Sequence, residues 1–175
     1  GERWVGGRAV GGRVMGWGGV GGRGGAIPEE AMDVRSKVYT YRTAVKWTEQ
    51  KKGTITCEGK PDIQVATPPE FKGHEGVWSP EDLYVASANI CLMTTFLAVA
   101  ERAGLAFTSY HCEAEGRLEL VEGKFQVTVI TLRPQIALQS GSDAAKAKEL
   151  IEKAEANCLI SNSMKTRITL EPTIT

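Results

Sequence analysis

The sequence lacks the excess of basic residues, the many cysteines and the paired cysteine motifs that are typical of nucleic-acid-binding, disulfide-rich and zinc-binding proteins. Its 21 basic residues balance its 21 acidic residues, so the net charge is zero and there is no electrostatic footprint for general phosphate binding. It has two histidines and only four cysteines, Cys57, Cys91, Cys112 and Cys158. These are too few and too irregularly spaced for a disulfide scaffold, and no CxxC pair suggests a zinc site. We therefore expect no nucleic-acid partner, no metal, and a cytoplasmic protein with reduced thiols.

Glycine is concentrated at one end of the chain. Of the 20 glycines, 12 fall in residues 1–25, a stretch with no hydrophobic period. Glycine-rich chain loses more entropy on ordering than its small apolar surface can offset. We therefore expect residues 1–34 to be a disordered Gly/Arg-rich leader, without the apolar segment of a signal peptide. It is either a non-native addition before Met32 or an RGG-type RNA-binding tail. The globular domain is expected over residues 35–175.

The globular part combines strand and helix signals. Six segments have the alternation or the β-branched composition of strands. They are Val38–Trp47, Thr54–Cys57, Asp62–Ala66, Phe107–Leu120, Lys124–Ile136 and Arg167–Leu170. The sequence Val121-Glu122-Gly123 predicts a hairpin turn between the two longest. A helix that begins at Ser142 or Asp143 carries an apolar stripe that ends at Cys158, on the core-facing side. The predicted order is strands, a helix, a hairpin and a second helix. This order is typical of an α+β fold.

A longer helix precedes the hairpin. Ser79-Pro80-Glu81-Asp82 supplies an N-cap, a proline suited to the first turn and two acids that the helix dipole favours, and Gly104 ends the helix. Its interior, Leu83–Ala100, has 18 residues without a charge, which is the length of a membrane span. Because this segment contains serine, asparagine and threonine, we expect no membrane association. We expect instead a helix buried on every side, by a sheet and by a second subunit.

Four segments of this part resemble a known family. They are Trp78-Ser79-Pro80-Glu81-Asp82-Leu83, Cys91 within an Ala/Ser/Thr-rich helix, Leu132-Arg133-Pro134, and Asn157-Cys158-Leu159-Ile160-Ser161-Asn162-Ser163. Over residues 38–174 the chain resembles the OsmC/Ohr family of bacterial thiol peroxidases, which reduce organic hydroperoxides. The resemblance implies an OsmC-like α+β fold, with antiparallel sheets packed around a long buried central helix. It also implies an intertwined homodimer with sites at the subunit interface.

The resemblance assigns roles to three residues. By it, Cys91 is the peroxidatic thiol, Cys158 is the resolving thiol and Glu81 is the acid that orients a catalytic arginine. The implied reaction reduces alkyl or fatty-acid hydroperoxides to alcohols through a Cys91 sulfenic acid and a Cys91–Cys158 disulfide, in a response to oxidative stress. A dithiol reductant, such as a lipoyl protein, supplies the electrons, and no cofactor is implied.

The sequence departs from the family at this arginine. Apolar surroundings disfavour a thiolate, and Cys91 lies about three turns into its helix, beyond the reach of the N-terminal dipole, so it needs a nearby cation. Glu70 stands where the OsmC pattern has arginine, and Glu49–Gly53 has glutamine and lysines where the Ohr pattern has it. The candidate activating cations are Lys51, Lys52 and Lys72, which could equally be solvated loop lysines.

The spacing of Glu81 and Cys91 is itself informative. The two residues are ten positions apart, which is about 15 Å along a straight helix. If both serve one site, Glu81 must act through an intermediary cation, through a kinked helix or from the other subunit.

The expected substrate pocket is apolar and favours alkyl or fatty-acid peroxides over hydrogen peroxide. Its expected walls include Phe71, Trp78, Leu92 and Phe96. Cys57 and Cys112 match no motif and are expected to be structural. Two other functions stay open: a dimer that binds a small ligand and uses its cysteines as a redox sensor, and an RNA-associated protein that acts through its leader.

Overall fold

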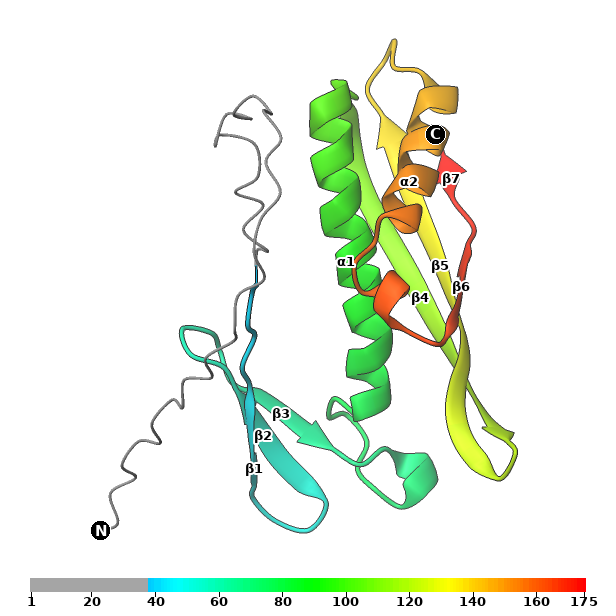
Figure 1. Ribbon diagram of the computed structural model, residues 1–175. Coiled ribbons are helices and arrows are strands. Elements are labelled where there is room, and N and C mark those ends of the chain that lie inside the picture. The colour runs from blue at the N-terminus through cyan, green and yellow to red at the C-terminus, as the bar shows by residue number, and fades with distance from the viewer. Residues whose placement is uncertain (1–37) are drawn as a thin grey trace, which may run out of the picture. The chain divides into compact units, whose positions relative to one another are not determined.

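The computed structural model describes residues 38–175, so the expected leader, residues 1–34, lies outside the described residues. The globular unit comprises Tyr41–Thr175. It contains two sheets and two α-helices, and the elements follow one another as strands, helix, hairpin, helix and strands (Figure 1). This order confirms the α+β fold that the sequence predicts.

The first sheet is a small antiparallel meander in the order β1-β2-β3. Its strands are β1 (Ala44–Trp47), β2 (Lys52–Thr56) and β3 (Ile63–Ala66). The alternation of Val38–Trp47 predicts a longer first strand than is observed. Pairing begins only at Ala44 because its partner is Thr56, the last residue of β2, beyond which no strand faces the chain. Residues 38–43 are exposed.

The long helix α1 (Pro80–Ala103) begins and ends where the sequence predicts. The Asp82 N–H donates to Oγ of Ser79 (3.1 Å), and the Ser79 N–H donates to the Asp82 carboxylate (2.9 Å), which is a capping box. Gly104 ends the helix at φ 62°, in the left-handed region that glycine adopts without a steric penalty.

The second sheet is built on a long hairpin of β4 (Phe107–Val121) and β5 (Lys124–Leu138). Two residues at positive φ, Glu122 and Gly123, form the predicted turn. The short strands β6 (Arg167–Leu170) and β7 (Thr173–Ile174) return beside β5 and pair with it in parallel. The sequence predicts β6 but not β7, because a strand of two residues leaves no periodic signal.

The core lies between the helices and one face of this hairpin (Figure 1). The second helix, α2 (Ala144–Ala156), is capped by Asp143, whose carboxylate accepts hydrogen bonds from two backbone N–H groups. Buried side chains come from α1, β5 and α2. They are Ala88, Leu92, Phe96, Ala100, Ile130, Leu132, Ile136, Ala147, Leu150, Ile151 and Ala154.

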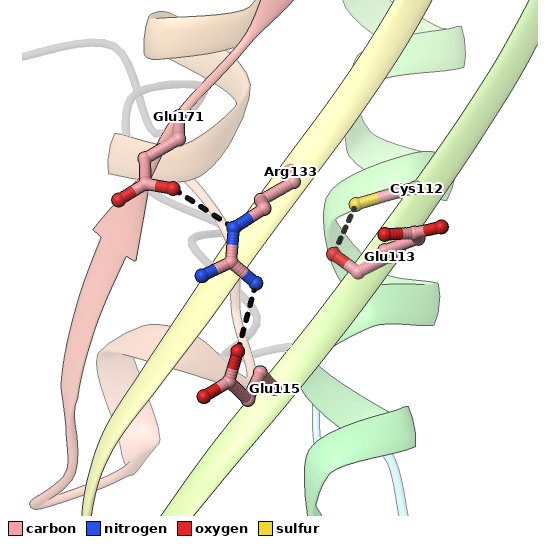
Figure 2. A network of polar contacts seen from close by, with 5 residues as sticks. All are labelled: Cys112, Glu113, Glu115, Arg133 and Glu171. Carbon is pink, nitrogen blue, oxygen red and sulfur yellow. Dashed lines mark hydrogen bonds and ion pairs between the residues drawn. The ribbon is translucent and has the colours of Figure 1, made fainter.

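The opposite face of the hairpin carries a network of ion pairs (Figure 2). Arg133 of β5 donates from Nη1 to Glu115 of β4 (3.0 Å) and from Nε to Glu171 (2.9 Å). The two carboxylates raise the pKa of Arg133. Its neighbours Leu132 and Pro134 are buried, so Arg133 points away from α1 and does not supply the cation that a thiol on α1 needs.

Helix α1 is not covered on every side by its own chain. Its buried residues form a single stripe spaced four apart, from Ala88 to Ala100, whereas Ile90 is 58% exposed and Leu97 is 41% exposed. Among the described residues, α1 is the one helix that is long and apolar enough to cross a membrane, a test that core helices also pass. The uncovered apolar side is where the predicted second subunit has room to pack.

Candidate functional site

Two cysteines that are far apart in the sequence lie together in the structure. Cys91 is in the middle of α1, and Cys158 follows the end of α2. The backbone N–H of Ile160 donates to Sγ of Cys91, with an N···S distance of 3.5 Å, and Cys91 lies close enough to Cys158 to raise the pKa of its thiol. The structure therefore brings together the two thiols to which the family resemblance assigns the peroxidatic and resolving roles.

The segment that follows α2 holds this arrangement in place. It is a tight turn that leads into the 3₁₀ helix η2 (Ser161–Ser163). The Asn162 N–H donates to the carbonyl of Cys158 (3.0 Å), and its side-chain amide donates to the carbonyl of Ala156 (3.1 Å). These bonds fix both Cys158 and the Ile160 N–H against α1.

Cys158 is completely buried, and its surroundings have opposing effects on the pKa of its thiol. Burial raises the pKa of the Cys158 thiol, and a hydrogen bond with Cys91 raises it further, whereas the side chain and the backbone N–H of Ser161 lower it. Burial is the largest of these effects, so Cys158 is a neutral thiol at pH 7. Its proton can therefore be donated toward the sulfur of Cys91.

A second set of predicted site residues surrounds the first turn of α1. One carboxylate oxygen of Glu81, Oε2, is buried and has no hydrogen-bond partner among the described residues. Glu81 lines two adjoining hollows of about 440 and 510 Å³, which share Phe71, Leu118 and Phe125. The rings of Phe71 and Phe125 meet edge to face with centroids 5.4 Å apart. We call this pair of hollows the Glu81 hollow.

Sequence reasoning missed several residues of the Glu81 hollow. Phe125 and Leu118 come from the tip of the β4–β5 hairpin, and Lys165 and Thr166 come from the segment before β6. Neither group has a motif of its own, and each is near Glu81 only because of the tertiary fold. Long hydrophobic residues at a hairpin tip are the one signal that could have indicated them, since such residues are unusual in an exposed turn.

Glu81 and Cys91 do not share one hollow within a single chain. Helix α1 is continuous between them, so the kink that the sequence left open is not present. Ten residues are about 2.8 turns, so the two side chains point about 80° apart around the helix. The surface between them is covered, because Ala88 is fully buried and Tyr84 Oη is 2.9 Å from the hydroxyl oxygen of Thr166. Two of the three possibilities remain, an intermediary cation or a second subunit.

The three candidate lysines occupy different places. Lys51 Nζ donates to the carbonyl of Phe71 (2.7 Å), in the 3₁₀ helix η1 (Pro69–Phe71), and so lies beside the Glu81 hollow. Lys52 pairs with Glu49 (3.5 Å) and lines a separate hollow. Lys72 is exposed at the end of η1. Of the three, Lys51 is the one that the structure ties to a wall of the Glu81 hollow.

The four residues expected to line one substrate pocket lie in different places. Phe71 lines the Glu81 hollow, and Trp78 is 53% exposed at the chain segment before α1. Leu92 and Phe96 are fully buried in the core, where the ring of Phe96 stacks on that of Tyr110. Their observed contacts are therefore with the core and not with an open pocket.

The other two cysteines lie elsewhere. Cys112 is on the inner face of β4, near Tyr110, and its thiol contacts the carbonyl of Glu113 (3.6 Å; Figure 2). Burial raises the pKa of the Cys112 thiol. Cys57 directly follows β2. All four cysteines are free, and no group of three His, Cys, Asp or Glu residues within residues 38–175 is placed to hold a metal ion.

Comparisons with known proteins identify a family and two relatives. The family described as OsmC-like protein matches residues 73–173. Peroxiredoxin OsmC of Escherichia coli is 33% identical over 101 residues, which cover 58% of this chain and 69% of that protein. The uncharacterised protein YmaD of Bacillus subtilis is 29% identical over 137 residues, which cover 76% of this chain and 91% of that protein.

Solved structures agree on the fold. An OsmC-like protein of unknown function from Vibrio cholerae superposes with a TM-score of 0.72 at 25% identity, over 77% of this chain and 99% of that one. An organic hydroperoxide resistance protein from Legionella pneumophila superposes with a TM-score of 0.64 at 21% identity, over 79% of this chain and 98% of that one.

Proposed function

Because this chain belongs to the OsmC family, which includes a peroxiredoxin, we propose that it is a thiol-dependent peroxidase that reduces organic hydroperoxides. A peroxiredoxin-like redox role accords with the family. The substrate class, the residue roles and the homodimer are our proposal. The observation that carries it is the contact of Cys91 with both Cys158 and the Ile160 N–H.

The proposed reaction has two steps. The thiolate of Cys91 attacks the distal oxygen of the hydroperoxide, so that an S–O bond forms, the O–O bond breaks, and the departing alkoxide takes a proton to become the alcohol. Cys158 then attacks the sulfur of the resulting sulfenic acid, an S–S bond forms and water leaves. One hydroperoxide and two thiols thus give one alcohol, one water and one disulfide. An external dithiol, such as that of a lipoyl protein, reduces the disulfide.

The geometry of the reduced protein suits Cys91 as the nucleophile and Cys158 as the resolving thiol. Burial keeps Cys158 neutral, the Ile160 N–H donates to the sulfur of Cys91, and the Cys158 thiol lies close enough for the two thiols to influence one another's ionisation. Preorganised donors aimed at an atom favour negative charge on it. This supports Cys91 as the nucleophile in a chain that lacks the family's arginine.

The Glu81 hollow supports a site completed by two subunits. Its buried carboxylate oxygen has no partner within the described chain. Buried side chains, among them Ala88, separate the Glu81 hollow from Cys91 of the same chain. Helix α1 exposes Ile90 close to Cys91. We propose that a second copy packs on this side of α1 and brings its own Glu81 hollow to the thiol pair.

The walls of the Glu81 hollow favour an apolar substrate. Phe71, Leu118 and Phe125 offer contact surface to an alkyl chain, and hydrogen peroxide gains nothing from such contacts. A steady-state assay with cumene hydroperoxide and dihydrolipoamide tests the function. We expect sustained turnover that exceeds turnover of hydrogen peroxide and that Cys91→Ser abolishes. Absence of turnover with the wild-type chain contradicts the peroxidase.

A second candidate function is a ligand-binding redox sensor with the same thiol pair. The unpartnered oxygen of Glu81 and the absence of an arginine at either family position favour it. A sensor becomes oxidised once, stoichiometrically, and dihydrolipoamide does not sustain peroxide consumption. The same assay therefore separates the two functions.

A further inference from the structure

Ser161 is a buried hydroxyl residue that the proposed reaction does not yet use. Ser161 is 8% exposed, its Oγ makes no hydrogen bond to a nitrogen or oxygen atom among residues 38–175, and the one group on which it acts is the Cys158 thiol. A buried hydroxyl without such a partner has lost its hydrogen bonds to water and gained none of equal strength in return. Such a group is costly to the fold, so its place beside a reactive thiol calls for an explanation.

The turn after α2 brings Ser161 beside Cys158. The two residues are three positions apart, and the hydrogen bond from the Asn162 N–H to the Cys158 carbonyl (3.0 Å) closes the turn between them. The backbone N–H of Ser161 therefore faces the Cys158 side chain, as the third N–H of a helix faces its N-cap residue. Both the hydroxyl and the N–H of Ser161 lower the pKa of the Cys158 thiol.

The same short turn thus serves both sulfur atoms. The Ile160 N–H donates to Cys91, and the next residue, Ser161, faces Cys158. A hydroxyl rotates freely about its C–O bond, so it can turn its proton toward a neighbouring sulfur that becomes charged. Hydrogen bonds to a charged acceptor are roughly twice as strong as those to a neutral one.

We propose that Ser161 is a positioning residue for the resolving step, whose hydroxyl donates a hydrogen bond to the sulfur of Cys158 as that sulfur gives up its proton. In this step the thiol proton of Cys158 leaves with the hydroxyl of the Cys91 sulfenic acid as water, and the S–S bond forms. When a dithiol later reduces the disulfide by attack at Cys91, the same hydroxyl stabilises the departing Cys158 thiolate. The resolving role of Cys158 rests on the proposed function, whereas the hydrogen bond between Ser161 and Cys158 does not.

The hydrogen bond is tested without any peroxide. In a chain in which Cys57, Cys91 and Cys112 are replaced by serine, labelled with ¹³C at the Cβ of cysteine, an NMR titration follows the ionisation of Cys158 alone. We expect Ser161→Ala to move the midpoint of the Cys158 transition to higher pH by about half a unit to one unit, a three- to tenfold loss of thiolate at a given pH. Ser161→Thr, which keeps a hydroxyl, should restore the midpoint. Ser163→Ala removes an exposed hydroxyl from the same turn and should leave it unchanged. An unchanged midpoint in Ser161→Ala overturns the proposal.

The role in resolution is tested with one equivalent of cumene hydroperoxide and all four cysteines present. We expect Ser161→Ala to form the Cys91 sulfenic acid as fast as wild type, to close the disulfide severalfold more slowly, and to accumulate more sulfinic acid, with the defect shrinking as the pH rises. Disulfide closure at the wild-type rate overturns the role. If Cys91 is not oxidised in the wild-type chain either, the proposed function fails, while the titration still decides the hydrogen bond.

Discussion

The backbone N–H of Ile160 donates to the sulfur of Cys91 across 3.5 Å, although 69 positions separate the two residues in the chain. A backbone donor held by a turn keeps its position whatever side chains surround it. It therefore offers a way to stabilise charge on sulfur that does not depend on the arginine missing from this sequence.

Glu81 and Asp82 are adjacent acids with different roles. Glu81→Gln replaces with an amide a half-buried carboxyl group of which one oxygen is buried without a partner, so we expect peroxide turnover to fall severalfold while thermal stability changes little. Asp82→Ala removes an acceptor of the capping box, so we expect the free energy of unfolding to fall by about 0.5–1 kcal/mol with turnover retained. Denaturant titration and the peroxidase assay measure both properties. A Glu81→Gln chain with full activity would contradict the role proposed for Glu81.

Lys51 and Lys52 are neighbours of the same charge, of which only Lys51 is bonded to Phe71. Lys51→Met removes the hydrogen bond that fixes this wall of the Glu81 hollow, so we expect a higher KM for cumene hydroperoxide. Lys52→Met loses only an exposed pair with Glu49, and its kinetics should match those of wild type. Equal KM values for the two variants would exclude a particular role for Lys51.

The uncovered side of α1 predicts a dimer. Ile90 is 58% exposed in the single chain, so Ile90→Asp should be tolerated by a monomer but not at an apolar interface. We expect wild type to sediment as a dimer at micromolar concentration and Ile90→Asp to sediment as a monomer. Lys148→Asp, on the exposed side of α2, is the control and should remain dimeric. A soluble wild-type monomer would rule out the dimer.

The buried thiols predict a loss of stability at alkaline pH. Burial raises the pKa of both Cys112 and Cys158 above the ordinary value of 9.0. Between the unfolded and folded pKa values the folded chain binds more protons, so the free energy of unfolding falls as the pH rises, and the contribution is complete below the ordinary value. We expect denaturant titrations to show this fall above about pH 9. Cys112→Ala should reduce its slope, and an unchanged slope would argue against burial of that thiol as its source.

Local signals in the sequence predict the elements of the fold well. Ser79 and Gly104 mark the ends of α1 because capping depends on a few neighbouring residues, and Gly123 marks the hairpin turn for the same reason. The parallel return of β6 and β7 beside β5 was not predicted, because a period of two does not specify which strand is the partner.

The site shows the same division between local and tertiary information. The apolar stripe of α2 places Cys158 toward the core, and its burial confirms that prediction. The partnership of Cys158 with Cys91 came from the family resemblance and not from periodicity. Lys165 and Phe125 reach the Glu81 hollow only through the fold, and the donor to Cys91 is a backbone N–H, which no side-chain pattern can indicate.

The most direct test of the account is peptide mapping after the reduced protein reacts with one equivalent of cumene hydroperoxide. Cys91 and Cys158 are in contact, whereas Cys57 and Cys112 lie on other elements, so we expect a disulfide between Cys91 and Cys158 within one subunit and two free thiols. In the Cys158→Ser chain, Cys91 should instead proceed to sulfinic acid, because nothing resolves its sulfenic acid. A Cys91 that stays reduced, or that pairs with Cys57 or Cys112, would contradict the account.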